Sequence, residues 1–291
     1  MTGISDPRQR SSVTEIMEEL SDFHYLLGRT AVARMEVDAV LESLFGLEPI
    51  VRESIPLIGT GFGRAFGMRG GLLFQNKDGS DATPALEKSL GQTAFAAKAE
   101  LLNRMLERAM LAGPADHDMP ALIQDGYSPQ KAWAAAKGSA DQEQQQARRL
   151  DQEPRWRKGR LRDVIATREL ALELMDLLTQ ATAHNNITIE QMLDGDQQRF
   201  RSLADGMPST RVAISLKVAY HRNPAHVWTV NDIHDIDALT VAVPYCDAVY
   251  TDKAVRRAIM ISRELKVFTT FLPRVPLELV DWLGRLPQPD D

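Results

Sequence analysis

The spacing of apolar residues along the chain predicts a mainly helical first two thirds. Apolar side chains recur every three or four positions in four stretches, which we expect to form helices: 11–27, 36–45, 84–111 and 161–184. A short run at 30–34 is a candidate strand. Gly28 would end the first helix. Thr188 and Ser209 each precede a helical segment and are expected to cap it, the second covering 211–221.

From Trp228 onward the pattern changes to short strands between helices. Asn231 or Asp232 can cap a helix that runs to Ala242, and Pro244 would end it. Two short apolar runs predict strands, and two further amphipathic runs predict helices: 248–251 and 267–270, and 254–265 and 276–286. Alternation of helix and strand is typical of an α/β layer with a parallel sheet.

The glycine-rich stretch 49–80 predicts a loop. Its glycines do not join a clear strand to a helix, and no Gly-Lys-Ser/Thr follows, so a flexible loop is favoured over a phosphate cradle: Gly59, Gly61, Gly63, Gly67, Gly70 and Gly71. A nucleotide-binding regulator is the function that would need such a cradle, and ATP would stabilise it.

The most basic stretch surrounds Trp156 and holds five cationic residues, Arg155, Arg157, Lys158, Arg160 and Arg162. It could contact RNA phosphates and stack a base. A solvated helix face with Trp156 packed beneath it is the favoured interpretation.

Composition narrows the class of protein. The chain has 291 residues, 44% of them hydrophobic, and a formal net charge of -6, which argues against an unselective coat for nucleic acids. Cys246 is the one cysteine, so no disulfide framework or cysteine-based zinc site can form within one chain. We find no signal-peptide pattern at the start and no apolar run long enough to span a membrane. These features predict a cytoplasmic protein that does not enter membranes.

Aspartates gather at two places in the last third. Asp232, Asp235 and Asp237 lie at the expected start of a helix, and Asp252 directly follows the expected strand 248–251. In an open α/β sheet these two places share one rim, so Asp235 and Asp252 can approach each other. Clustered carboxylates bind Mg²⁺ or Mn²⁺, and such an ion activates water for phosphodiester hydrolysis. For each aspartate alone, capping a helix is the commoner explanation.

Three histidines and three cations lie near these aspartates. His221, His226 and His234 lack the spacing of three or four that a helical metal pair needs, so a histidine site is disfavoured. Three further residues are candidates for phosphate contact, although a solvated helix face is the more common explanation: Arg211, Lys217 and Arg222.

The segment from Asp235 to Lys253 resembles the C-terminal half of PIN domains. In that family an aspartate opens a helix, a small residue follows seven positions on, and a strand ends in threonine and an acidic residue. Here those residues are Asp235, Ala242, Thr251 and Asp252. The resemblance extends over about 207–286, and more weakly over 10–45, where Glu36 matches the family's acidic residue.

The resemblance implies a PIN-like three-layer α/β fold with a short parallel sheet. Residues 1–48 and 206–291 would form it, and 49–205 would be a large, mainly helical insertion or subdomain. Glu36, Asp235 and Asp252 would be catalytic and would hold Mg²⁺ or Mn²⁺, assisted by Asp232 or Asp237.

The implied function is a metal-dependent endoribonuclease acting on RNA, of which a toxin-like member of a toxin–antitoxin pair is one form. An antitoxin-like partner protein and a homodimer are left open. PIN domains begin with a hydrophobic strand that ends in an aspartate, whereas Asp6 follows no apolar run here. We therefore expect either that an upstream segment supplies this strand or that the chain is an inactive, PIN-like binding protein.

Overall fold

The chain folds into two compact units in a computed structural model. The structure describes residues 4, 6–48, 55–66, 74–115, 117–126, 128–193 and 197–287. One unit comprises Met1–Gly28 and Ile55–Ala134, and the other comprises Arg29–Ser54 and Ala135–Asp291. The chain passes from the first unit to the second after Gly28, returns to the first at Ile55 and passes back after Ala134. These boundaries differ from the predicted ones at 48 and 205.

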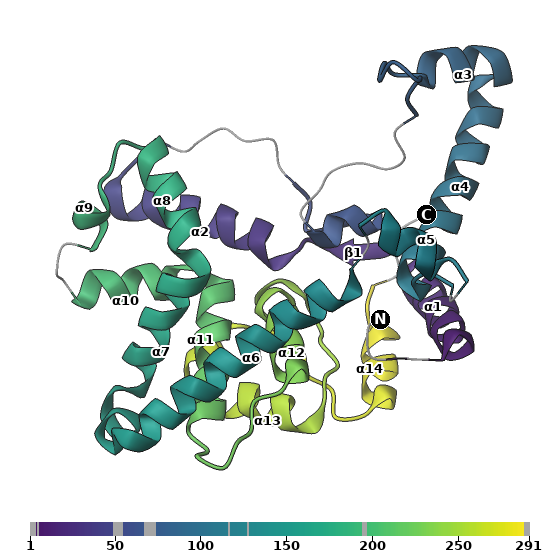
Figure 1. Cartoon of the computed structure of the whole chain (residues 1–291). Helices are drawn as coiled ribbons and strands as arrows, with labels where there is room; N and C mark the ends of the chain where they lie inside the picture. The colour runs from purple at the N-terminus through teal and green to yellow at the C-terminus, as the bar shows by residue number, and fades with distance from the viewer. Residues whose placement is uncertain are drawn as a thin grey trace. The chain divides into compact units, whose positions relative to one another are not determined.

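The first unit holds a pair of antiparallel strands and several helices (Figure 1). Strand β1 (His24–Leu26) pairs with β2 (Ile58–Thr60), with Tyr25 opposite Gly59. Helix α1 (Pro7–Ser21) packs against α4 (Gln92–Ala112), which projects beyond it and carries α3 (Thr83–Leu90) at its far end. The 3₁₀ helix η1 (Phe62–Phe66) and α5 (Met119–Gln124) complete the unit.

Local backbone geometry ends two of these helices earlier than predicted. Asp22 adopts a left-handed conformation with φ of 45°, which stops α1 at Ser21 rather than at Gly28. Gly91 has φ of 83° and divides the predicted helix 84–111 into α3 and α4. Of the glycine-rich loop, Gly59 lies in β2 and Gly63 in η1, whereas Gly67, Gly70 and Gly71 lie outside the described residues.

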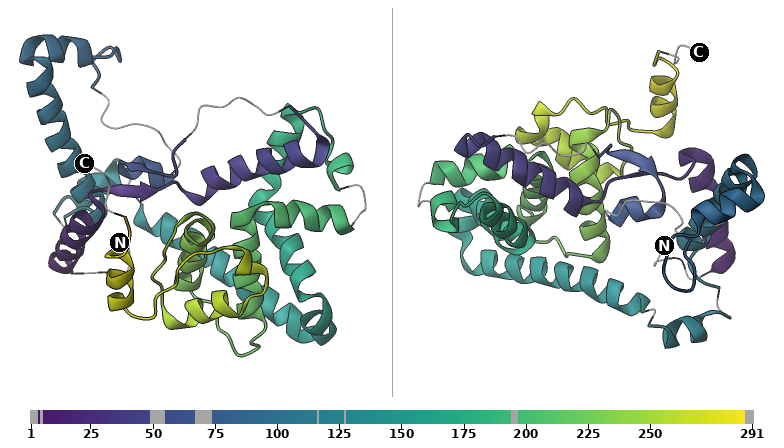
Figure 2. Two further views of the ribbon diagram at one scale, coloured as in Figure 1. Left: turned by 180° about the vertical axis from the view of Figure 1, so that it is seen from behind. Right: turned by 90° about the horizontal axis from the view of Figure 1, so that it is seen from above.

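The second unit is a helical assembly around α11 (Pro208–His221). This helix is buried along most of its length and packs against α12 (Val230–Tyr245), α7 (Leu161–Glu169) and α2 (Arg29–Phe45) (Figures 1 and 2). Five further helices or helical turns surround it: α8 (Met175–His184), α9 (Ile189–Leu193), α10 (Gln197–Gly206) and the π-helical turns η2 (Trp156–Arg160) and η3 (Leu170–Leu174). The long α6 (Pro129–Gln152) contributes its part from residue 135 onward.

Two hydrophobic clusters in this unit explain the helical pattern. One gathers α2, α7, α8 and α10 around residues such as Leu41, Leu178 and Leu203, and Trp156 packs against it, as predicted. The other joins α11, α12 and α13 (Lys253–Ile261) through residues such as Leu216 and Ile236.

The predicted strand at 30–34 is wrong, because these residues belong to α2. Ala33, Val37 and Leu41 follow one another at intervals of four and are all buried, so a continuous helix covers the core with one face. The predicted cap at Thr188 is confirmed, since its hydroxyl accepts from the backbone N–H of Gln191 at 3.0 Å. Ser209 is not a cap: it lies inside α11, whose N-cap is Met207.

The predicted PIN-like three-layer fold with a parallel sheet is contradicted. The described residues are 72% helix and 4% strand, and their one sheet is the antiparallel pair of the first unit. At 248–251 and 267–270 the structure has only an isolated parallel bridge between Ala248 and Phe271. Pairing between the two runs stops at this one bridge, and direct packing of α11 on α12 buries the helix faces that would otherwise cover a sheet.

The predicted helices 254–265 and 276–286 are both shorter in the structure. The first is α13, which the 3₁₀ helix η4 (Glu264–Val267) follows, and the second is α14 (Pro276–Leu283). In the part of the chain that the structure describes, no helix has both the length and the apolar character needed to cross a membrane.

Candidate functional site

The start of α12 is held by a capping box. The hydroxyl of Thr229 accepts from the backbone N–H of Asp232, and Asp232 Oδ2 accepts from the backbone N–H of Thr229 at 2.7 Å. The predicted caps, Asn231 and Asp232, were therefore close to the true N-cap, Thr229. Asp232 has a structural function here, because its carboxylate accepts from the backbone N–H and the hydroxyl of Thr229 and so closes the capping box.

Asp252 is the N-cap of α13. Its Oδ1 accepts from the backbone N–H groups of Ala254 at 2.7 Å and Val255 at 2.9 Å. The side chain is exposed, and these contacts leave its other carboxylate oxygen open. Capping therefore does not prevent Asp252 from binding a ligand.

Asp235 differs from both. It lies half-buried in the second turn of α12 and has no hydrogen-bond or salt-bridge partner among the described residues. Burial and the negative charges of Asp252 and Asp232 raise its pKa above the usual value. The three aspartates thus lie near enough for their charges to act on one another, and a cation would relieve the repulsion.

Tyr220 borders this acidic cluster. Burial and the charges of Asp232, Asp235 and Asp252 raise the pKa of its phenol, which stays protonated at neutral pH. The ring stacks on His226 with centroids 4.7 Å apart and meets Trp228 edge to face at 5.5 Å. His226 Nε2 lies 3.4 Å from Asp232 Oδ2.

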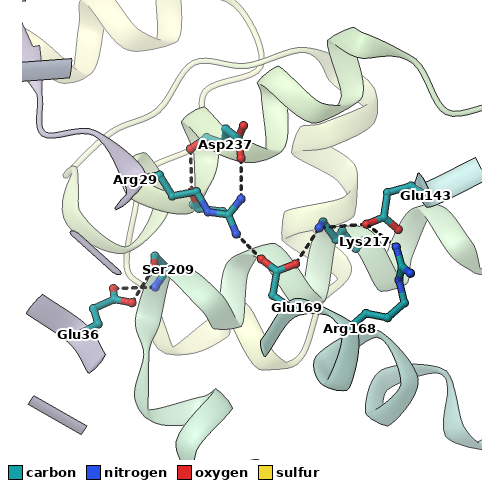
Figure 3. A network of polar contacts seen from close by, with 9 residues as sticks. Arg29, Glu36, Glu143, Arg168, Glu169, Ser209, Lys217 and Asp237 are labelled. Carbon is teal, nitrogen blue, oxygen red and sulfur yellow. Dashed lines mark hydrogen bonds and ion pairs between the residues drawn. The ribbon is translucent and has the colours of Figure 1, made fainter. Parts of the chain in front are cut away.

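Glu36, the third predicted metal ligand, has other partners. Its carboxylate accepts from the backbone N–H of Ser209 at 2.8 Å and from the Ser209 hydroxyl at 2.6 Å (Figure 3). It also accepts from the Tyr245 hydroxyl at 2.6 Å. Burial raises the pKa of Glu36, and these hydrogen bonds oppose that effect. The structure therefore places Glu36 in a satisfied, buried contact that ties α2 to α11 and α12.

Asp237 joins a buried ionic network instead of the acidic cluster. Its Oδ1 accepts from Arg29 at 2.6 Å, and Arg29 also donates to Glu169, which is fully buried (Figure 3). Lys217 donates to Glu169 at 2.7 Å and lies 3.1 Å from Glu143. Cations and carboxylates thus alternate through the network.

The pKa values in this network follow from its pairing. Burial by itself would raise the pKa of Glu143, but the hydrogen bond from His221 and the charges of Lys217 and Arg168 lower it to about 2. Burial would likewise raise the pKa of Glu169, yet Lys217 and Arg29 hold it below the usual value. The network is internally compensated and needs no added ion.

The three histidines do not form a common metal site. His221 is buried, and burial lowers its pKa, so the neutral ring donates from Nε2 to Glu143 at 2.9 Å. His226 stacks on Tyr220, and His234 is exposed. Among the residues that the structure describes, no three acidic, histidine or cysteine side chains are already grouped around one metal position.

The three residues predicted to contact phosphate differ in their burial and in their partners. Lys217 is buried between two glutamates, and Arg211 donates to the backbone oxygen of Asp205 at 2.7 Å. Only Arg222 lies exposed at a groove. Elsewhere in the predicted basic stretch, Arg157 donates to Asp151 at 2.5 Å and to the backbone oxygen of Ala147 at 3.1 Å.

Comparison with protein-family models, with curated proteins and with solved structures finds no match to this chain.

Sequence reasoning missed the buried network and Tyr220. A signal for the network was present, because Glu169 follows Leu161 and Ile165 at intervals of four and so falls on an apolar stripe. A charged residue at such a position is buried and needs a partner. No comparable signal pointed to Tyr220, whose importance depends on three aspartates from α12 and α13.

Proposed function

We propose that this chain is a metal-dependent ribonuclease in which Asp235 and Asp252 bind Mg²⁺ or Mn²⁺. The observation that carries the proposal is Asp235, a half-buried carboxylate with no partner in the described structure and with two acidic neighbours. Each buried carboxylate in the described part of the chain has a hydrogen-bond or ion-pair partner. A half-buried carboxylate without such a partner is explained best by a cation.

The donor set fits a hard divalent ion. Mg²⁺ is usually held by one or two protein carboxylates, with water and substrate phosphate oxygens completing its shell. Two aspartates therefore suffice, and Glu36 is not required. When bound, such an ion supplies an activated water and stabilises the charge that develops on a phosphoryl oxygen.

Neighbouring groups support phosphodiester chemistry. The Tyr220 phenol remains protonated, so it can donate a hydrogen bond to a phosphate oxygen next to the aspartates. The resemblance of 235–253 to PIN domains supports the same reaction class. The proposal needs only this local arrangement and no three-layer sheet.

Thermal stability tests the metal site. Mn²⁺ should raise the melting temperature of the wild type, because a ligand at 100 times its Kd stabilises the folded state by about 2.7 kcal/mol. Asp235→Asn and Asp252→Asn should lose this response, while the exposed control Asp281→Asn should keep it. An equal response in all four proteins would place the ion elsewhere.

Cleavage of a labelled single-stranded RNA tests the activity. Hydrolysis should require Mg²⁺ or Mn²⁺, stop in EDTA and be lost in Asp235→Asn, whose fold should remain intact. Full Mn²⁺-dependent cleavage by Asp235→Asn would disprove the assignment.

A non-catalytic, PIN-like binding protein is the second candidate function. The satisfied, buried position of Glu36 favours it, since the resemblance assigns that residue to the catalytic set. This candidate predicts stabilisation by Mn²⁺ without cleavage of RNA, or neither response.

A further inference from the structure

A groove of about 670 Å³ opens between the C-terminal halves of α11 and α13. These helices pack against each other in the second unit, as Figure 1 shows. Small and apolar side chains, among them Ala219, Ala258 and Ile261, line part of it. Arg222 and Arg263 also line it, from the segments that follow the two helices.

The two arginines are available to a ligand. Both are exposed, and neither has a hydrogen-bond or salt-bridge partner for its side chain among the described residues. The acidic residue at the groove, Glu264, accepts from Arg162 at 2.7 Å and from the Ser215 hydroxyl at 3.2 Å. Its charge is thus already compensated, and the uncompensated charge at the groove is positive.

The C-terminal ends of α11 and α13 would repel an anion in this groove. Each carries about half a negative elementary charge, which explains why an arginine is favourable beside each end. Together they amount to about one charge, against two full positive charges on the guanidinium groups. Dipole complementarity accounts for one arginine at each helix end, but not for both lining a single groove.

We propose that this groove binds backbone phosphates of single-stranded RNA on one side of the cleavage site. This inference rests on the proposed ribonuclease function. Helix α13 links the two places, with Asp252 at its start and Ile261 of the groove at its end. Nine helical residues span about 13 Å, so the groove would hold phosphates a few nucleotides from the scissile bond.

The chemistry of the groove suits phosphate rather than base recognition. Arginine presents a planar fork of donors that fits a phosphate in a bidentate manner. Contacts to phosphate position a strand but do not read its sequence. The groove should therefore increase affinity for RNA of any sequence.

Binding of fluorescent single-stranded RNA to the full chain, measured in EDTA to prevent cleavage, tests the proposal. The double variant Arg222→Gln/Arg263→Gln should bind about tenfold more weakly or worse. The salt dependence, as the slope of log K against log salt concentration, should fall by about 1.4, since each lost phosphate contact on a single strand removes about 0.7. Unchanged affinity and slope would overturn the proposal.

Arg257→Gln is the matched control, because Arg257 is exposed on the same helix but does not line the groove. It should bind RNA as the wild type does, and all variants should keep the wild-type melting temperature. A loss in the control equal to that of the double variant would show diffuse charge attraction instead of a site. Binding of inorganic phosphate that depends on both arginines, with an RNA affinity that the double variant leaves unchanged, would assign the groove to the free anion and overturn the RNA proposal.

Cleavage with Mn²⁺ separates this inference from the proposed function. The double variant should show a raised KM on RNA with kcat retained. If the wild type cleaves RNA and the double variant has an unchanged KM, the groove proposal fails and the ribonuclease stands. If RNA binds through the two arginines but is never cleaved, the ribonuclease proposal fails and the groove remains an RNA site. Absence of both binding and cleavage would overturn both.

Discussion

Two groups of charged residues in the second unit differ in how their charges are paired. In the buried network, Arg29 and Lys217 separate Glu169 from Asp237 and Glu143, so each carboxylate has a cationic partner. In the acidic cluster, Asp235 has no hydrogen-bond or ion-pair partner within the described structure, and the charges of Asp252 and Asp232 raise its pKa. The first arrangement contributes to folding, whereas the second costs stability unless a cation binds.

The difference shows why burial of charge is not by itself a sign of function. The buried network looks at first like an active site, because its pKa values are strongly perturbed. Each of its carboxylates already has a cationic partner, however, so the network leaves no unpaired charge for a ligand to bind. Asp235 is less buried, and the proposed metal site depends on it because its carboxylate has no partner among the described residues.

Removal of Lys217 should have the largest effect on stability. Lys217→Met leaves Glu169 and Glu143 buried without their shared ammonium group, which should cost about 3–5 kcal/mol of unfolding free energy. Urea denaturation measures the loss, and the exposed Lys266→Met serves as control. A loss below about 1 kcal/mol would mean that the network contributes little to the stability of the fold.

The same network should make the protein acid-sensitive. Because the pKa of Glu143 is lowered in the folded state to about 2, its contribution is complete above the unfolded value of 4.5 and is lost as the pH falls toward 2. Glu169 shifts in the same direction. The unfolding free energy, measured from pH 6 downward, should decrease by an amount on the order of 3 kcal/mol. Glu143→Gln should flatten this decrease; an equally steep curve would contradict the assignment.

Loss of the Tyr245 hydroxyl should have an intermediate effect. Tyr245→Phe removes one of three hydrogen bonds to the buried Glu36 carboxylate, and hydrogen bonds to charged groups contribute about 1.5–3 kcal/mol. Thermal or urea unfolding measures the difference, with the exposed Tyr250→Phe as control. Metal binding should stay unchanged in Tyr245→Phe. A specific loss of the Mn²⁺ response would instead bring Glu36 into the metal site.

Neutralising Asp235 should have the smallest effect on stability, and of opposite sign. In EDTA, Asp235→Asn should stabilise the protein by a few tenths to about 1 kcal/mol, because repulsion from Asp252 and Asp232 disappears. The raised pKa of Asp235 means that its ionisation penalises the metal-free fold as the pH rises above 3.8. A destabilised Asp235→Asn in EDTA would show that this carboxylate has a structural partner.

The sequence predicted much of the local structure in the second unit. Apolar residues three or four positions apart, such as Leu161 and Ile165, identified helices, and the Thr188 cap was predicted from one residue and its position. Such signals are local, because a helix is specified by side chains three and four positions apart. The same kind of signal placed Asp252 before a helix, where it caps α13.

Strand prediction failed for a reason that local patterns cannot reveal. A run of four apolar residues forms a strand only if another strand pairs with it along its length. At Ala248 the partner is Phe271, and pairing stops after one bridge. The run at 30–34 lies within α2 and pairs with no strand among the residues that the structure describes.

Residue types and spacing alone therefore determined most of the helices, the caps at Thr188 and Asp252, and the presence of an acidic segment in the last third. Only the tertiary structure decided which acids are free to bind a cation. It paired Asp237 with Arg29 and Glu36 with Ser209 and Tyr245, and it left Asp235 facing Asp252 and Asp232. The physical reason is that a carboxylate's function depends on which charges and donors surround it. Those neighbours come from helices distant in the chain, which no local pattern specifies.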